Sequence, residues 1–156
     1  MIYEYGMQAP VLYGAGAAEK VGDKLKGMGC TRALCICDEG VKKAGILDTI
    51  TANLPAAGIA TVVFDRVLPV PPNSMIDEVG ALVRECGADC VVGIGGGSSM
   101  DTAKAAAMLY KNPGSISDYL NFDGPPVFWE GGLPVVLLPT TAGTGSEVSD
   151  GGVFVD

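Results

Sequence analysis

Histidine is absent from the 156 residues of this chain, and basic residues are scarce. Ten Lys and Arg stand against 18 Asp and Glu, and the net charge of −8 argues against nucleic-acid binding through a basic face. The apolar runs are too short to cross a membrane. The opening residues Met1-Ile2-Tyr3-Glu4 lack the basic and apolar regions of a signal peptide. These absences predict a protein without nucleic-acid or membrane partners.

Zinc-ribbon spacing is also absent, although the chain has five cysteines. An odd number of cysteines without an export signal predicts reduced thiols and a cytoplasmic location. Because free cysteine is often buried, we expect these residues to act as small core hydrophobes. No metal site is expected within this chain. The cysteines are Cys30, Cys35, Cys37, Cys86 and Cys90.

What the chain does contain is apolar segments that alternate with amphipathic ones. Its 156 residues, 48% of them hydrophobic, suit one α/β domain spanning residues 1–156. Strands alternating with helices predict a parallel sheet covered on both faces. Strands are expected at Ala9–Tyr13 (an edge, because of Pro10), Ala33–Cys37, Ala60–Phe64, Val91–Ile94 and Pro134–Leu138. Helices are expected around Ala18–Met28, Leu47–Leu54, Ile76–Cys86 (capped by Asn73 or Ser74) and after Ser98, with an irregular excursion over Asn112–Gly132.

A glycine turn follows the strand Val91–Ile94. Gly95, Gly96 and Gly97 carry no side chains, so a ligand can approach their backbone N–H groups. Ser98 is predicted as the N-cap of the next helix, with Asp101 at capping-box spacing. A helix N-terminus attracts anions, which predicts a pyrophosphate site here. The alternative is a tight turn that uses glycine for its geometry alone.

Two further polar segments are expected at the same edge of the sheet, because ligands bind beyond the carboxyl ends of parallel strands. Asp38 can accept hydrogen bonds from an adenosine ribose, or it can simply start a helix. The loop after Pro139 offers the hydroxyls of Thr140, Thr141 and Thr144, which suit phosphate or ribose oxygens. Its alternative is a polar loop in which Thr144 and Glu147 cap a new helix.

Gly95-Gly96-Gly97-Ser98-x-x-Asp101-Thr102-Ala103-Lys104 and Pro139-Thr140-Thr141-Ala142-Gly143-Thr144-Gly145-Ser146-Glu147-Val148 together resemble the two signatures of the iron-containing (group III) alcohol dehydrogenase family. The resemblance implies a three-layer Rossmann-like domain followed by a helical second domain. It also implies NAD(P)-dependent interconversion of an alcohol and its aldehyde or ketone.

By position, the resemblance implies that Gly96, Gly97 and Ser98 hold the pyrophosphate of NAD or NADP and that Asp38 meets the ribose. Thr140, Thr141 and Thr144 would line the adenine and phosphate side. Gly95 and Asp101, in the same motif, complete the predicted cofactor site. Where relatives often show Pro-Asn-Pro, this chain has Pro69-Val70-Pro71.

The metal ligands of the family, an Asp and three His, lie in the helical domain, and this chain has no histidine. We therefore expect the helical domain to be absent here, and Fe(II) or another divalent metal to bind only in a full-length parent. No catalytic residue is predicted within the chain, which would be inactive alone. The alternatives are a stand-alone nucleotide-binding module without catalysis, or a zinc-using relative such as glycerol dehydrogenase or dehydroquinate synthase. The expected partners are a small alcohol or aldehyde and a second copy, paired through Met1–Met7.

Overall fold

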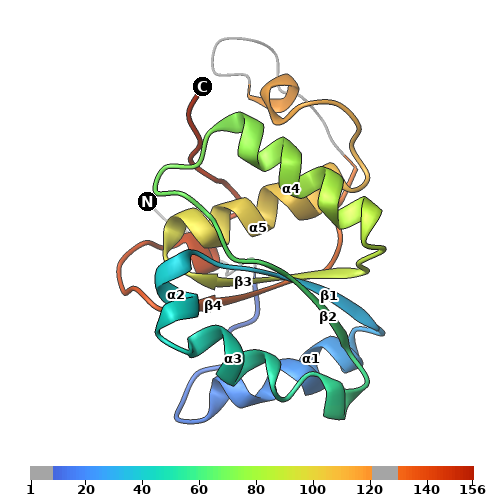
Figure 1. The fold of residues 1–156 in the computed structure, drawn as a ribbon, viewed down its shortest axis with the longest axis vertical. Coiled ribbons are helices and arrows are strands. Elements are labelled where there is room, and N and C mark those ends of the chain that lie inside the picture. Colours follow the sequence, from blue (N-terminus) through green and yellow to red (C-terminus); the bar gives the residue numbers. More distant parts are fainter. Residues whose placement is uncertain (1–8, 121–129) are drawn as a thin grey trace, which may run out of the picture.

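The computed structural model describes residues 9–120 and 130–156, which form a parallel sheet between two layers of helices (Figure 1). Within these residues, the strands are β1 (Arg32–Ile36), β2 (Ala60–Phe64), β3 (Cys90–Gly95) and β4 (Val135–Pro139). Their order in the sheet is β2-β1-β3-β4, and each neighbouring pair is parallel. The predicted α/β class and parallel sheet are confirmed.

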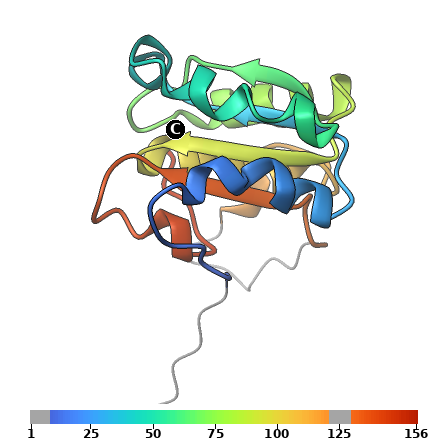
Figure 2. The same cartoon turned by 90° about the horizontal axis from the view of Figure 1, so that it is seen from below.

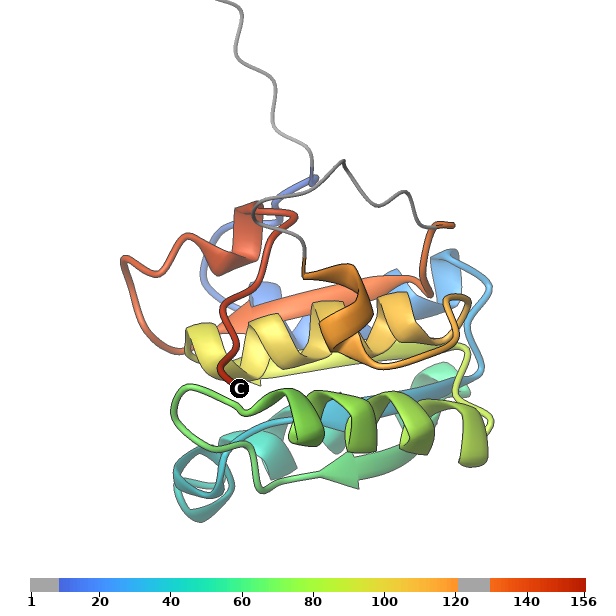
Figure 3. The ribbon, with the colours of Figure 1, turned by 90° about the horizontal axis from the view of Figure 1, so that it is seen from above.

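Helices cover both faces of this sheet (Figures 2 and 3). One face carries α1 (Val21–Gly27), α2 (Glu39–Lys43) and α3 (Ile46–Thr51), and the other carries α4 (Asn73–Glu85) and α5 (Gly97–Leu109). Short 3-10 helices are η1 (Ala17–Lys20), η2 (Pro55–Ala57), η3 (Ile116–Tyr119) and η4 (Ser146–Val148). The helices α4 and α5 lie side by side along the strands (Figure 3).

Alternation along the central strands divides the core into two parts. In β1, Ala33 and Cys35 pack in the core beneath α1 and α3, whereas Leu34 and Ile36 pack in the core beneath α4 and α5. All residues of β3 are buried, as expected for a central parallel strand. In contrast, β4 is only half-buried, because it is the edge strand of the described sheet. The prediction of a buried strand at Pro134–Leu138 was therefore wrong about its burial.

The helix α5 lies very close to the sheet because small residues meet at the contact. A Cβ added to Gly93 would lie 2.8 Å from Cβ of Ala103 and 2.9 Å from Cδ2 of Leu137. Ala106 and Ala107 on the same helix are also buried. This close packing fixes the position of the N-terminus of α5 relative to the end of β3.

Several local predictions were wrong. Residues 9–13 form no strand in the described part of the chain, and Tyr13 is 97% exposed. The N-cap of α4 is Pro72, without a side-chain cap, because Asn73 is already helical. The N-cap of α5 is Gly96, two positions before Ser98, and the predicted capping box with Asp101 does not form.

The remaining segments add little to the site. The predicted excursion over 112–132 contains η3, and its residues 121–129 lie outside the described residues, as does the predicted pairing segment Met1–Met7. Among the described residues, no helix has the length and hydropathy needed to span a membrane.

Candidate functional site

A cleft of about 1170 Å³ lies beyond the carboxyl ends of the described strands. Segments that follow each of β1, β2, β3 and β4 contribute to its walls. Six of the nine predicted cofactor residues belong to its lining: Asp38, Gly96, Gly97, Ser98, Thr140 and Thr141. The sheet therefore brings together three polar segments that are far apart in the sequence.

The floor of the cleft is the turn from β3 into α5. The N-cap residue Gly96 has extended backbone angles and offers no side chain to the helix. The N–H groups in the first turn of a helix have no intrahelical acceptor, so those of Gly97, Ser98 and Ser99 are available to a ligand. Together with the helix macrodipole, they favour an anion at this position.

The glycines of this turn are required for different reasons. Gly95 has a φ of +144°, and a Cβ there would lie 2.7 Å from Oγ of Ser99 and 3.3 Å from Oδ2 of Asp38. Local geometry alone thus demands glycine at Gly95. At Gly97, a Cβ would meet only Thr144, at an ordinary 3.7 Å. A side chain at Gly97 would therefore be tolerated sterically by the described residues.

Asp38 both starts α2 and faces the cleft. Its Oδ1 accepts a hydrogen bond of 2.9 Å from the N–H of Val41, which confirms the helix-start interpretation. Its Oδ2 accepts from Oγ of Ser99 over 3.5 Å, a long contact that leaves acceptor capacity free. The carboxylate is therefore held in place by its own helix while one oxygen remains available to a ligand hydroxyl.

The loop after β4 is tied to the glycine turn at its start. The N–H of Thr140 donates to the carbonyl of Gly95 over 2.9 Å, so both segments share one backbone contact. Thr144 does not line the cleft. Its Oγ1 donates to Oε2 of Glu147 over 3.1 Å and accepts from the N–H of Ser146 over 3.3 Å. Thr144 therefore belongs to a polar loop at the start of η4, as the alternative predicted, but the N-cap of η4 is Gly145 and not Thr144.

Asp101 lies away from the cleft in a buried clasp. Its Oδ1 accepts from Oγ of Ser146 over 2.5 Å, and its Oδ2 accepts from the N–H of Val153 over 3.1 Å. The ammonium of Lys104 lies 3.0 Å from the same carboxylate and donates to the carbonyl of Ser146 over 3.0 Å. This clasp fixes the segment after β4 against α5, and the structure does not bring Asp101 to the other predicted site residues.

The segment after β2 contributes a wall of the cleft that was not predicted from the sequence. Asp65 and Arg66 line the cleft there. The ammonium of Lys42, another lining residue, donates to Asp65, and this bond lowers the pKa of the Asp65 carboxyl. Asp65 directly follows Phe64, the last residue of β2, so the rule that selected Asp38 could have found it.

A strained residue lies next to the cleft. Val70 has a φ of +51°, an unfavourable conformation for a β-branched residue. Its N–H donates to Oγ of Ser98 over 3.3 Å, which links the stiff proline loop to the first turn of α5. Strain at this position therefore accompanies a contact to a predicted site residue.

A parallel sheet with a glycine turn and a helix N-terminus beyond its carboxyl ends is typical of the nucleotide-binding α/β class. The family model for iron-containing alcohol dehydrogenases matches residues 9–156, and the chain belongs to this family. The choline dehydrogenase of Bacillus subtilis is 38% identical over 146 residues, covering 94% of this chain and 36% of that protein. The long-chain-alcohol dehydrogenase 1 of Geobacillus thermodenitrificans is 39% identical over 137 residues, covering 88% and 35%.

Solved structures agree with this assignment. A 1,3-propanediol oxidoreductase superposes with a TM-score of 0.86 at 30% identity, over 96% of this chain and 38% of that one. The sulfoacetaldehyde reductase of Bifidobacterium kashiwanohense, solved with NAD⁺, gives a TM-score of 0.84 at 30% identity, over 96% and 39%. The chain thus spans little more than a third of the relatives it matches.

Proposed function

We propose that this chain is the nucleotide-binding portion, residues 1–156, of a longer NAD-dependent dehydrogenase that interconverts an alcohol and its aldehyde or ketone. Membership of the iron-containing alcohol dehydrogenase family supports the reaction class. Relatives named for choline, long-chain alcohols and lactaldehyde support a small-molecule alcohol or aldehyde as the substrate class.

The observation that carries the proposal is the uncapped N-terminus of α5 at the floor of the cleft. The free N–H groups of Gly97, Ser98 and Ser99 are suited to the pyrophosphate of NAD. The absence of a side chain at Gly97, where an added Cβ would make only ordinary contact with Thr144, supports a close approach of the ligand to the backbone. The NAD⁺ complex of the Bifidobacterium relative supports the choice of dinucleotide.

The remaining predicted residues fit around this position. Oδ2 of Asp38 can accept a hydrogen bond from a ribose hydroxyl, and a carboxylate there disfavours the extra phosphate of NADP. Thr140 and Thr141 offer hydroxyls at the same cleft. We therefore assign Asp38 to the ribose, and Thr140 and Thr141 to the adenine and phosphate side. Gly95 and Thr144 do not line the cleft but contact residues that do: the carbonyl of Gly95 accepts from the N–H of Thr140, and Thr144 lies beside Gly97.

The chemical step depends mainly on groups outside these residues. NAD, when bound, supplies the hydride acceptor at its nicotinamide ring. The residues of this chain bind and orient the dinucleotide. The metal ligands that the family implies, an Asp and three His, cannot come from a chain without histidine, so we assign no metal-dependent step to it. We expect no turnover of a primary alcohol with NAD by these residues alone.

We propose that the protein is located in a reducing compartment. The five cysteines are all free, which supports a reducing compartment such as the cytoplasm.

We also propose a homodimer that pairs through Met1–Met7. Sedimentation of the chain with and without these residues should give a dimer and a monomer, and a monomer in both cases would contradict the pairing.

Calorimetric titration with NAD tests the cofactor site through Gly97→Ala. A Cβ fits the ligand-free fold at Gly97, in ordinary contact with Thr144. Under the proposed function it would also hinder the approach of the pyrophosphate to the N–H groups at the start of α5. We expect NAD affinity to fall about 10- to 100-fold, as for other overpacked contacts. Gly27→Ala is the matched control, because Gly27 is exposed in α1 and has no neighbour near its added Cβ. An unchanged affinity in Gly97→Ala would contradict the assignment.

A further inference from the structure

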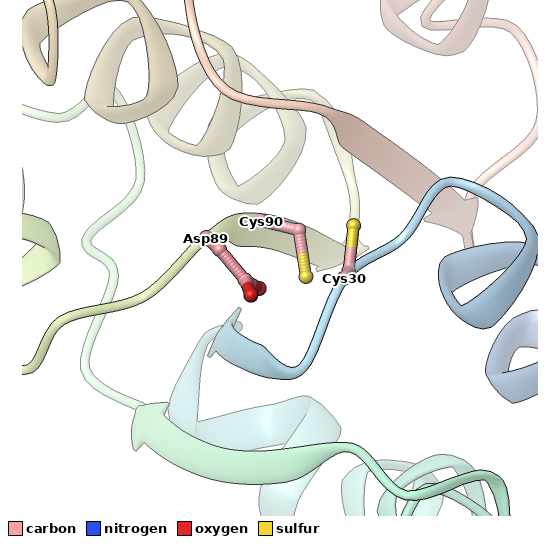
Figure 4. Close-up of side chains that lie close together, drawn as sticks. All are labelled: Cys30, Asp89 and Cys90. Carbon is pink, nitrogen blue, oxygen red and sulfur yellow. The ribbon is translucent and has the colours of Figure 1, made fainter.

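Two thiols and a carboxylate meet at the amino end of β3, at the opposite end of this strand from the cleft (Figure 4). Cys90 begins β3, Asp89 directly precedes it, and Cys30 lies between α1 and β1. Their ligand atoms lie within 4.8 Å of one another, and both cysteines are buried. None of the three residues lines the cleft.

The separation of these atoms is close to that of a tetrahedral metal site. With Zn–S bonds of about 2.3 Å and Zn–O bonds of about 2.0–2.2 Å, two sulfur ligands lie about 3.8 Å apart and a sulfur and an oxygen about 3.5 Å apart. The ligand atoms of Cys30, Asp89 and Cys90 lie within 4.8 Å of one another, so they would have to approach by at most about 1.3 Å to reach these values. Thiolate and carboxylate donors together suit zinc and similar divalent ions.

Asp89 is already oriented as a metal ligand would be. Its Oδ2 accepts from the N–H and the Oγ1 of Thr31, over 2.8 Å and 2.7 Å. Its Oδ1 accepts from the N–H of Arg32 over 2.9 Å, and the thiol of Cys90 lies close enough to hydrogen-bond with the same carboxylate. Three hydrogen bonds from Thr31 and Arg32 hold the carboxylate, and its remaining acceptor capacity faces the Cys90 thiol, whose proton a metal would replace.

Loss of the thiol proton of Cys90 leaves no backbone group unpaired. The thiol donates to the carbonyl oxygen of Arg32 over 3.6 Å. That carbonyl also accepts from the N–H of Asp89 over 2.9 Å, so it remains hydrogen-bonded when a metal replaces the proton. The protein can thus exchange a thiol proton for a metal bond without a buried acceptor losing its partner.

We propose that Cys30, Asp89 and Cys90 bind a divalent metal ion of the zinc type, with water as the fourth ligand on the half-exposed side of Asp89. The ion joins the turn between α1 and β1 to the start of β3, which are distant in sequence. Its role is structural, since it fastens the end of the sheet that carries no cleft. The proposal is independent of the NAD assignment.

Cadmium titration of the reduced, metal-free full chain tests this proposal, with thiolate-to-cadmium absorption in the ultraviolet as the readout. We expect one equivalent of Cd²⁺ to produce the band in the unmodified chain. Cys30→Ser and Cys90→Ser should each abolish stoichiometric binding, and Asp89→Asn should weaken it about tenfold or more. Cys86→Ser is the matched control, because this half-buried thiol lies elsewhere, donating to the carbonyl of Val83.

X-ray absorption of the zinc-loaded, unmodified chain provides a second test that does not depend on the folding of any variant. We expect two sulfur ligands at about 2.3 Å and lighter ligands at about 2.0 Å. The absence of a cadmium band in the unmodified chain would overturn the proposal. A band that survives in both Cys30→Ser and Cys90→Ser, or a zinc site with no sulfur or with four, would also overturn it.

Discussion

The two ends of β3 differ in how their polar groups are satisfied. At the carboxyl end, the N–H groups of Gly97, Ser98 and Ser99 face a cleft without a side-chain cap. At the amino end, Asp89 accepts three hydrogen bonds from its neighbours. About 17 Å of strand separate them, at 3.3 Å for each residue.

This difference supports the proposal that an exchangeable ligand binds at the carboxyl end. Unpaired donors at the end of a buried strand are costly unless water or a ligand reaches them, so their retention favours binding over stability. Paired groups at the other end stabilise the sheet in the absence of any ligand. The first end is therefore suited to the exchangeable anion of the proposed function, while the paired groups of the second end stabilise the sheet.

The largest effect is expected from Gly95→Ala, which breaks the geometry of the carboxyl end. The substitution places a Cβ 2.7 Å from Oγ of Ser99 at a φ of +144°. We expect the free energy of unfolding to fall by about 3 kcal/mol, from strain and overpacking together. Denaturant unfolding measures this loss, with Gly97→Ala as the control that keeps its stability. Equal stabilities of the two variants would contradict the distinction between these glycines.

A smaller loss is expected from Asp89→Ala at the amino end. Although burial opposes it, hydrogen bonding from Thr31 and Arg32 lowers the pKa of Asp89. Removal of these bonds should cost about 2 kcal/mol of unfolding free energy at neutral pH. Because the folded pKa lies below the ordinary value of 3.8, this contribution is present above pH 4 and is lost as the pH falls further. The stability difference between the two proteins should therefore shrink in acid, and a constant difference would contradict this account.

Alkaline pH should lower the free energy of unfolding, because buried thiols near the strand β3 keep their protons in the folded state. Burial raises the pKa of the Cys35 thiol from its ordinary 9.0 to about 12. Burial and the charge of Asp38 raise the pKa of Cys37 to about 11. The unfolded chain loses these protons first, so stability should fall by up to about 1.4 kcal/mol per pH unit for each thiol above pH 9. Cys35→Ala should reduce this slope in urea unfolding, whereas an unaltered slope would place the cause elsewhere.

The smallest effect is a gain in stability at Val70, beside the carboxyl end. Val70→Asn replaces a β-branched residue at a φ of +51° by one that tolerates the left-handed region. We expect the free energy of unfolding to rise by about 1 kcal/mol. Thermal unfolding checks the change, and Val67→Ala serves as a reference, since removing two methyl groups from a buried residue should lower stability. A loss of stability in Val70→Asn would refute the strain.

Much of the architecture could be predicted from local patterns. The apolar run Ala60–Phe64 coincides with β2, and the spacing of Ile76, Val79 and Val83 places them on the buried side of α4. Apolar runs and helical spacing indicate burial directly, so predictions made from them do not require knowledge of the tertiary structure. Both family signatures follow a predicted strand. Because ligands bind beyond the carboxyl ends of parallel strands, this placement predicted where the cleft lies.

Features that depend on neighbours could not be predicted. The start of α5 at Gly97 and not after Ser98 depends on how Gly95 bends the chain. The displacement of Asp101 from the cleft depends on Ser146 and Val153, which approach it only after folding. The meeting of Cys30 with Cys90 likewise depends on sheet register, which brings together residues with no recognisable spacing.

The most direct test of the central claim is an NMR titration of the ¹⁵N-labelled chain with NAD. We expect the largest shifts at the backbone amides of Gly97, Ser98 and Ser99, with a smaller response at Asp38. The amides of Asp89 and Cys90 at the far end of β3 should remain unchanged. If NAD binds while the Gly97–Ser99 amides stay unshifted, the assignment of the pyrophosphate to this helix N-terminus is contradicted.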